Sequence, residues 1–163
     1  MSTEQSRKLP RYEKCFVCGR GNGAGLDVQF WREGDVIRAE WTPQERHRGY
    51  LDRVHGGVVA SILDEAMGWA PSHQVGRLFY SVEISVRYRR PVEIGRRFRV
   101  EGRMLENRRR LVRCEGRLLD EEGNVCASSS GTYVALPGGK TEEVLEYLYV
   151  EGDESRPVSI ADF

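Results

Sequence analysis

The chain has 163 residues, which is enough for one domain with a sizeable core. Its 25 Lys+Arg residues balance 25 Asp+Glu residues, and a net charge of zero argues against a nucleic-acid-binding protein. No apolar stretch approaches the roughly 20 residues of a membrane span, and the polar N-terminus has no apolar signal-peptide region. We therefore expect a cytoplasmic protein that contacts neither nucleic acid nor membrane.

Residues 1–14 are polar, and we expect them to form a flexible N-terminus before a domain at residues 15–140. The domain opens on Cys15-Phe16-Val17-Cys18-Gly19, which is half of a zinc-ribbon pattern. No second Cys-x-x-Cys or His-x-His follows to complete four ligands, and a Gly-rich loop follows where a redox pair would have a strand-to-helix junction. We favour reduced structural cysteines at a turn and predict neither metal nor cofactor. A metal site and a redox pair are the alternatives.

Two β-rich runs come next, at residues 26–31 and 36–41. The residues between them, Arg-Glu-Gly-Asp, are typical of a hairpin turn. A charged loop over residues 42–54 then leads to the most informative stretch of the chain.

That stretch is a His-Gly-Gly turn that opens a predicted helix at residues 57–70, which Pro71 ends. Apolar side chains occur nearly all round this helix, so we expect it to be buried. A carboxylate there must be paired, hydrogen-bonded or shifted in pKa. Glu65 points about 100° away from Asp64, and we expect it to meet solvent or an Arg at a rim. One side of the helix carries small residues around Asp64: Gly57, Ala60, Ser61 and Gly68.

Four strand patterns follow, at residues 82–88, 98–105, 111–119 and 125–136, and we expect them to form an antiparallel meander. A single helix that is apolar all round needs a sheet that curls around it. The predicted fold is therefore α+β, with a curled antiparallel sheet wrapped around one central helix. The tail at residues 141–163 is expected to be a C-terminal appendage, with a short amphipathic helix at 142–149 that packs on a neighbouring subunit.

Several motifs resemble those of PaaI-like hotdog-fold acyl-CoA thioesterases. They are the His-Gly-Gly turn with Asp64 nine positions after its His, and the pattern Cys-x-x-Cys-Gly…Asn…Gly-Leu over residues 15–26. Tyr-Arg-Arg-Pro at 88–91 and Gly-x-x-x-Ala at 123–127 add to the match. The resemblance covers residues 15–136. It implies the hotdog fold, hydrolysis of an acyl-CoA thioester to free acid and coenzyme A, and assembly as a homodimer, with pairing into a homotetramer left open.

The resemblance also implies residue roles. Asp64 matches the carboxylate that attacks the thioester carbonyl or activates a water, and Ser81 matches a position that orients this water. His55 matches the motif His, which is a positioning residue or, as the alternative, a base. The backbone N–H groups of Gly56 and Gly57 match the oxyanion hole, which suits a helix N-terminus. Gly49 stands where some relatives carry an Asn, so one polar contact to the thioester is in doubt.

Coenzyme A has phosphates, for which Arg is well suited. The resemblance places basic residues near the turn at 108–110 on the nucleotide portion, and the arginines before Pro91 are a second candidate. The expected CoA-binding residues are Arg90, Arg108, Arg109 and Arg110.

Spacing along the helix bears on how a site is assembled. Gly57 and Asp64 lie seven residues apart, which is about 10 Å on one helix. A reacting carbonyl must lie about 3 Å from both its attacker and its oxyanion donors. We therefore predict an obligate homodimer with two shared sites, in which the glycines of one subunit face Asp64 of the other.

Other functions remain open. A non-catalytic module that binds acyl-CoA or lipid would keep the pocket and the arginines without needing Asp64. A hydratase or dehydratase would need a catalytic His with a carboxylate, and the predicted helix carries no His on its face. A purely structural role would satisfy Asp64 with a local partner. The acyl group is not determined by the sequence.

Overall fold

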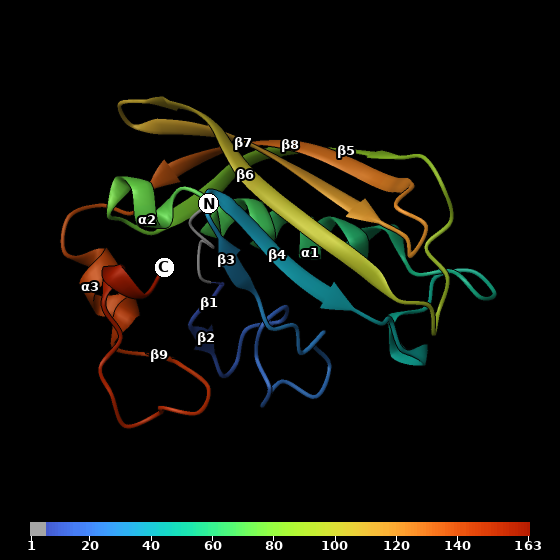
Figure 1. Cartoon of the computed structure of the whole chain (residues 1–163), viewed down its shortest axis with the longest axis horizontal. Coiled ribbons are helices and arrows are strands. Elements are labelled where there is room, and N and C mark those ends of the chain that lie inside the picture. The colour runs from blue at the N-terminus through green and yellow to red at the C-terminus, as the bar shows by residue number, and fades with distance from the viewer. Residues whose placement is uncertain (1–5) are drawn as a thin grey trace.

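The computed structural model describes residues 6–163, in which an antiparallel sheet of seven strands curls around one long helix (Figure 1). The strands lie in the order β1-β3-β4-β6-β7-β8-β5. Their bounds are β1 Arg7–Lys8, β3 Trp31–Glu33, β4 Val36–Trp41, β5 Phe79–Tyr88, β6 Phe98–Arg108, β7 Leu111–Leu119 and β8 Val125–Ala135. A two-stranded sheet pairs β2 (Arg11–Tyr12) with β9 (Leu148–Tyr149). The helices are α1 Gly56–Trp69, α2 Ser72–Val75 and α3 Lys140–Leu145, with 3-10 turns at Glu45–His47 and Ile160–Asp162.

Helix α1 lies on the concave face of the sheet, where it packs against β4, β5, β6, β7 and β8 (Figure 1). Its sheet-facing side is fully buried and consists of Val59, Ile62, Leu63, Ala66 and Met67. The α+β hotdog architecture is thereby confirmed. The burial is one-sided, however, because Gly57 is exposed and the small residues around Asp64 are only half-buried. The small-residue side of α1 is therefore open in the protomer.

The strand order differs from the expected four-strand meander. Strands β6, β7 and β8 do form one, but β5 pairs with β8 at the edge of the sheet. Residues 89–97 then carry the chain across to β6, which pairs with β4 over six residues. The prediction of a four-strand meander was wrong because α1 crosses the concave face of the sheet. The chain therefore enters β5 at the sheet edge, next to β8.

The first predicted strand is also shorter than expected. Only Trp31 of residues 26–31 enters the ladder with β4. The amides of Leu26 and Val28 instead donate to the carbonyls of Phe16 and Val17, at 2.8 and 2.9 Å. Residues 26–28 are therefore hydrogen-bonded to the loop that carries Cys15 and Cys18, which we call the cysteine loop, and not to a neighbouring strand.

The described N-terminal residues from residue 6 onward and the tail at residues 141–163 pack onto the domain, in contrast to the flexible N-terminus and peripheral tail that we expected. Residues 1–5 lie outside the described part, but Leu9 is fully buried and its amide donates to the Phe30 carbonyl. The tail pairs with the N-terminal segment through β2 and β9 (Figure 1). Phe163 is buried against Trp69, with ring centroids 5.1 Å apart. These contacts bury Leu9 and Phe163, two apolar residues in segments that the sequence pattern did not assign to the core.

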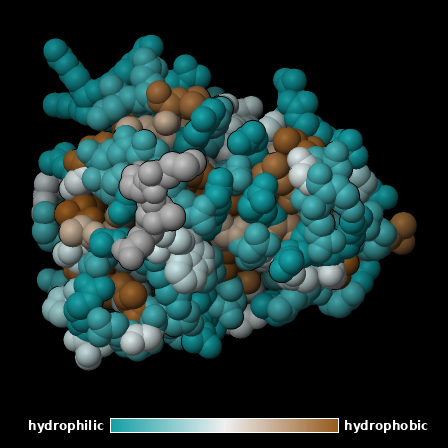
Figure 2. Space-filling view, viewed as in Figure 1, coloured by the Kyte–Doolittle hydropathy of each residue, from teal (hydrophilic) through white to brown (hydrophobic). Residues whose placement is uncertain are grey.

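The part of the surface that Figure 2 shows is largely polar. Figure 2 shows one face on which hydrophilic residues predominate and hydrophobic residues appear in small groups. Within residues 6–163, no helix is both long and apolar enough to cross a membrane.

Candidate active site

Asp64 lines a hollow of about 170 Å³, which lies between α1, the start of β5 and β8. Ser81 lines the same hollow, so the structure brings together these two of the predicted site residues. The remaining lining is largely aromatic and small: Glu65, Gly68, Trp69, Phe79, Tyr80 and Tyr133. The large side chains of Trp41 and Met67 lie in the core and do not line this hollow.

Tyr133 of β8 is the polar partner of Asp64. Its hydroxyl donates to Asp64 Oδ1 at 2.9 Å and also lies 3.3 Å from the Asp64 carbonyl oxygen. Burial raises the pKa of the Asp64 carboxyl, and the hydrogen bond from Tyr133 partly opposes that rise. Burial and the Asp64 charge raise the pKa of Tyr133, so the phenol stays protonated and donates. The sequence alone did not identify Tyr133, because 69 residues separate it from Asp64.

The start of β5 is irregular next to this hollow. The register between β5 and β8 shifts between Ser81 and Glu83, which marks a β-bulge. Val82, the residue between them, is 60% exposed. Bulges commonly lie beside active sites, where they change the direction of a side chain. Here the bulge lies directly beside the hollow that Tyr80 and Ser81 line.

The N-terminus of α1 is capped by the imidazole of His55. Its Nδ1 accepts a hydrogen bond from the Gly57 amide at 3.0 Å, which requires the proton to be on Nε2. Tyr88 of β5 donates its hydroxyl to the Gly56 carbonyl at 2.6 Å. Within residues 6–163 the Gly56 amide has no hydrogen-bond partner. Of the two predicted oxyanion donors, Gly57 is therefore engaged by His55 and Gly56 is free.

A second, larger pocket of about 530 Å³ surrounds this helix terminus. His55, Gly56 and Tyr88 line it together with Arg89 and Arg90, the two arginines before Pro91, and with Arg53, which sequence reasoning missed. These three cationic side chains come from the loop before α1 and the loop after β5. They give the pocket a positive rim next to a free backbone amide.

The other predicted arginines lie elsewhere in the protomer. Arg108, Arg109 and Arg110 form the β6–β7 turn, where Arg108 pairs with Glu106 at 2.7 Å. Through the ladder, Leu111 pairs with Val134, which pairs with Tyr80. The turn is therefore at the end of the sheet where β5 begins, whereas Arg90 follows the end of β5.

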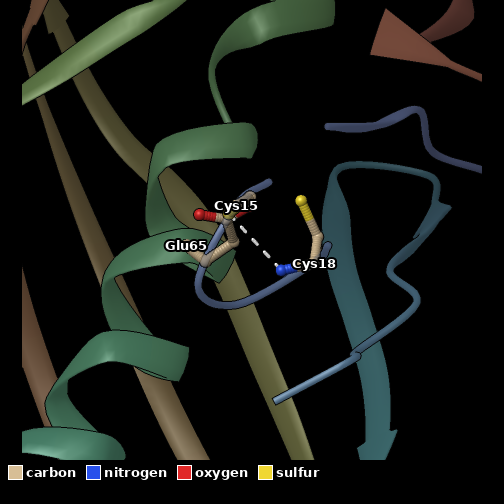
Figure 3. Close-up of side chains that lie close together, drawn as sticks. All are labelled: Cys15, Cys18 and Glu65. Carbon is tan, nitrogen blue, oxygen red and sulfur yellow. Dashed lines mark hydrogen bonds between the residues drawn. The ribbon is translucent and has the colours of Figure 1, made fainter. Parts of the chain in front are cut away.

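Glu65 contradicts the expectation that it meets solvent or an Arg. Its Oε1 accepts a hydrogen bond from Trp69 Nε1 at 3.1 Å. The same oxygen lies 3.6 Å from Cys15 Sγ, and Figure 3 shows these two side chains next to each other. The reason is tertiary: the cysteine loop, held by residues 26–28, covers this side of α1.

Comparison with known proteins places these features in context. Residues 51–127 match the family model described as the thioesterase superfamily, a segment that includes His55, Asp64 and Ser81. No curated protein matches the sequence. A solved thioesterase superfamily protein is 26% identical, with a TM-score of 0.70 over 75% of this chain. This chain spans 60% of the length of that protein.

Two further solved structures share the fold at lower identity. The PaaI protein from the phenylacetic acid degradation operon of E. coli is 15% identical, with a TM-score of 0.64 over 69% of this chain and 82% of its own. A hypothetical thioesterase from Streptococcus pneumoniae, solved with coenzyme A, is 14% identical, with a TM-score of 0.58 over 61% of this chain and 80% of its own.

Proposed function

We propose that this chain is a PaaI-like enzyme of the thioesterase superfamily, whose model matches residues 51–127, and that it hydrolyses an acyl-CoA thioester to a free acid and coenzyme A. One observation carries the proposal: Asp64 lies in a hollow with Ser81 and is held by the Tyr133 hydroxyl at 2.9 Å. A half-buried carboxylate fixed in this way has one oxygen bound and one left for chemistry.

Asp64 attacks the thioester carbonyl or removes a proton from a water that attacks it. Partial burial raises the pKa of its carboxyl, which makes the carboxylate a better base. Tyr133 keeps the carboxylate in one orientation, and Ser81 holds the water. When water attacks, the tetrahedral intermediate breaks its C–S bond to give the free acid, and the proton held by Asp64 passes to the leaving thiolate of coenzyme A. When Asp64 attacks, the thiolate leaves an acyl–Asp64 anhydride, which a water then hydrolyses to the free acid.

The developing oxyanion is stabilised at the N-terminus of α1. The free Gly56 amide can donate to the oxyanion, and the positive end of the helix dipole lies at the same terminus. His55 acts as a positioning residue, since its imidazole fixes the first turn through the Gly57 amide. Tyr88 holds the Gly56 carbonyl from the other side.

The two halves of the site come from two subunits. In one protomer, Asp64 and Ser81 lie at the start of β5 and Gly56 contacts Tyr88 at its end. Strand β5 is an edge strand with unpaired backbone groups, and its side chains Tyr80, Val82 and Tyr88 are exposed. Antiparallel pairing of two β5 strands about a two-fold axis sets the start of one opposite the end of the other. This arrangement supports a homodimer with two shared sites.

Coenzyme A fits the same arrangement. Arg53, Arg89 and Arg90 surround the free Gly56 amide. In the proposed dimer they approach the Arg108–Arg110 turn of the partner, because that turn lies where β5 begins. Together these arginines bind the phosphates. The S. pneumoniae structure with coenzyme A and one from Streptococcus mutans with acetyl CoA support this ligand class.

The first experiment measures thiol release from a panel of acyl-CoA thioesters, aromatic through long-chain. We expect wild-type protein to hydrolyse at least one, and Asp64→Asn to lose at least about 100-fold in kcat with folding unchanged. Glu121→Gln, which alters an exposed carboxylate on the β7–β8 turn, is the matched control. Full activity of folded Asp64→Asn would refute the role of Asp64.

The same assay tests the shared site. Gly56→Pro removes the free amide at the first helical position, where Pro is well tolerated, and we expect about 100-fold lower kcat. Mixing equal amounts of refolded Gly56→Pro and Asp64→Asn subunits gives dimers of which half contain one intact site. We expect about a quarter of wild-type activity to return. No return, despite exchange of subunits, would place each site within one chain.

A non-catalytic acyl-CoA-binding module is the second candidate, favoured by the arginines around the helix terminus. It predicts tight acyl-CoA binding, no thiol release from any panel member, and the same affinity in Asp64→Asn.

A further inference from the structure

Two cysteines and a carboxylate lie together outside the proposed active site. Cys15, Cys18 and Glu65 each offer one ligand atom, and these atoms all lie within 4.8 Å of one another (Figure 3). The cysteines come from the loop before β3 and the carboxylate from α1. We propose that Cys15, Cys18 and Glu65 bind a Zn²⁺ ion that joins this loop to α1.

The distances suit a tetrahedral ion. With Zn–S of about 2.3 Å and Zn–O of about 2.0–2.2 Å, the edge between a sulfur and an oxygen ligand is about 3.6 Å. Cys15 Sγ and Glu65 Oε1 lie 3.6 Å apart. Small side-chain adjustments bring Cys18 Sγ to the same ion. The three protein ligands leave a fourth position for water.

The loop is built to present a thiolate. The amides of Val17 and Cys18 donate to Cys15 Sγ at 3.3 and 3.4 Å. Hydrogen bonds from the Cys18 side chain and then from these amides lower the pKa of the Cys15 thiol, against the effect of burial. A sulfur that accepts several N–H groups is favoured as an anion. It is therefore a ready ligand for a soft divalent cation.

Gly19 is required by the same turn. Its amide donates to the Cys15 carbonyl at 3.0 Å. A Cβ at this position would lie 2.5 Å from that oxygen and 2.8 Å from the Cys15 amide. The loop is also fixed from outside, because buried Arg11 donates from Nε to the Cys18 carbonyl at 2.7 Å. Rigid support of this kind is what a preorganised metal site needs.

Glu65 is otherwise poorly satisfied. Burial raises the pKa of its carboxyl to about 8. Its Oε1, the oxygen that lies 3.6 Å from Cys15 Sγ, also accepts a hydrogen bond from Trp69 Nε1 at 3.1 Å, which orients the carboxylate. A cation replaces the proton that Cys15 and Glu65 otherwise share, and it compensates two half-buried anionic groups at once. Cys15 and Glu65 are half-buried, which leaves an entry path, whereas Cys18 is buried.

The test uses the full chain, reduced, stripped with a chelator and reloaded with Zn²⁺ alone. We expect one zinc per chain by mass spectrometry, and Co²⁺ in its place to give the thiolate charge-transfer and visible bands of a tetrahedral site. Zinc should also raise the melting temperature of the wild type.

Cys15→Ala and Glu65→Gln should each weaken zinc binding by more than about 100-fold, since even outer-shell partners are worth about 10–100-fold. Cys126→Ala removes a free cysteine outside the cluster and should keep one zinc. Circular dichroism reports whether each variant folds. Zinc-free wild type, zinc retained by Cys15→Ala, or a Cys15–Cys18 disulfide that re-forms in place of zinc binding after reduction and reloading would each overturn the proposal.

Discussion

At Gly102 the sheet lies very close to the helix that carries Asp64. A Cβ at this buried position of β6 would lie 2.5 Å from the Ala66 carbonyl carbon and 2.9 Å from the Met67 amide, and closer still to the Ala66 oxygen. These are backbone atoms of α1 and cannot rotate away. Gly102→Ala must therefore push the helix from the sheet by about 1 Å to restore ordinary contact distances.

The cost follows from that displacement. Forcing an extra methyl group into a packed core costs about 1–3 kcal/mol. For a chain of this size we expect the melting temperature to fall by about 2–12 °C. Because Asp64 lies on the displaced helix, kcat should also fall by up to about 100-fold, the effect of a misplacement of about 1 Å.

The assays are thermal melting and urea unfolding at fixed protein concentration, together with thioesterase activity. Gly138→Ala is the matched control, because a Cβ there meets no atom within 4 Å. It should leave stability unchanged or raise it slightly, since Ala restricts the unfolded chain. If Gly102→Ala unfolds at the same urea concentration as Gly138→Ala and keeps full activity, then the helix is not held by this contact and the reasoning is refuted.

Two further predictions concern the site itself. Tyr133→Phe removes the hydroxyl bound to Asp64 at 2.9 Å; at about 1.5–3 kcal/mol for a hydrogen bond to a charged group, kcat should fall at least tenfold with KM little changed. Unchanged kcat in steady-state assays would show that Asp64 needs no such partner. Arg90→Gln should raise KM about tenfold for acyl-CoA but leave KM unchanged for the same acyl group on N-acetylcysteamine, which lacks the phosphates. An equal rise for both thioesters would contradict phosphate binding at Arg90.

Local sequence signals were sufficient for much of this protein. Apolar residues all round residues 57–70 and alternation in the strands after them predicted one helix inside a curled sheet, because burial pattern is set residue by residue. The spacing of Asp64 from the His-Gly-Gly turn gave both its face of the helix and its distance from the helix N-terminus. Ser81 was placed by resemblance, and the structure puts it beside Asp64.

The contacts between segments that are distant in the sequence were decided only by the tertiary structure. No local pattern joins Tyr133 to Asp64, Tyr88 to Gly56, or Arg53 to Arg90, because each pair meets only through strand order and register. The same holds for β5, whose edge position depends on α1 crossing the sheet. It holds for Glu65 as well: helix periodicity gave the direction of its side chain, but only the fold brought the cysteine loop there to meet it.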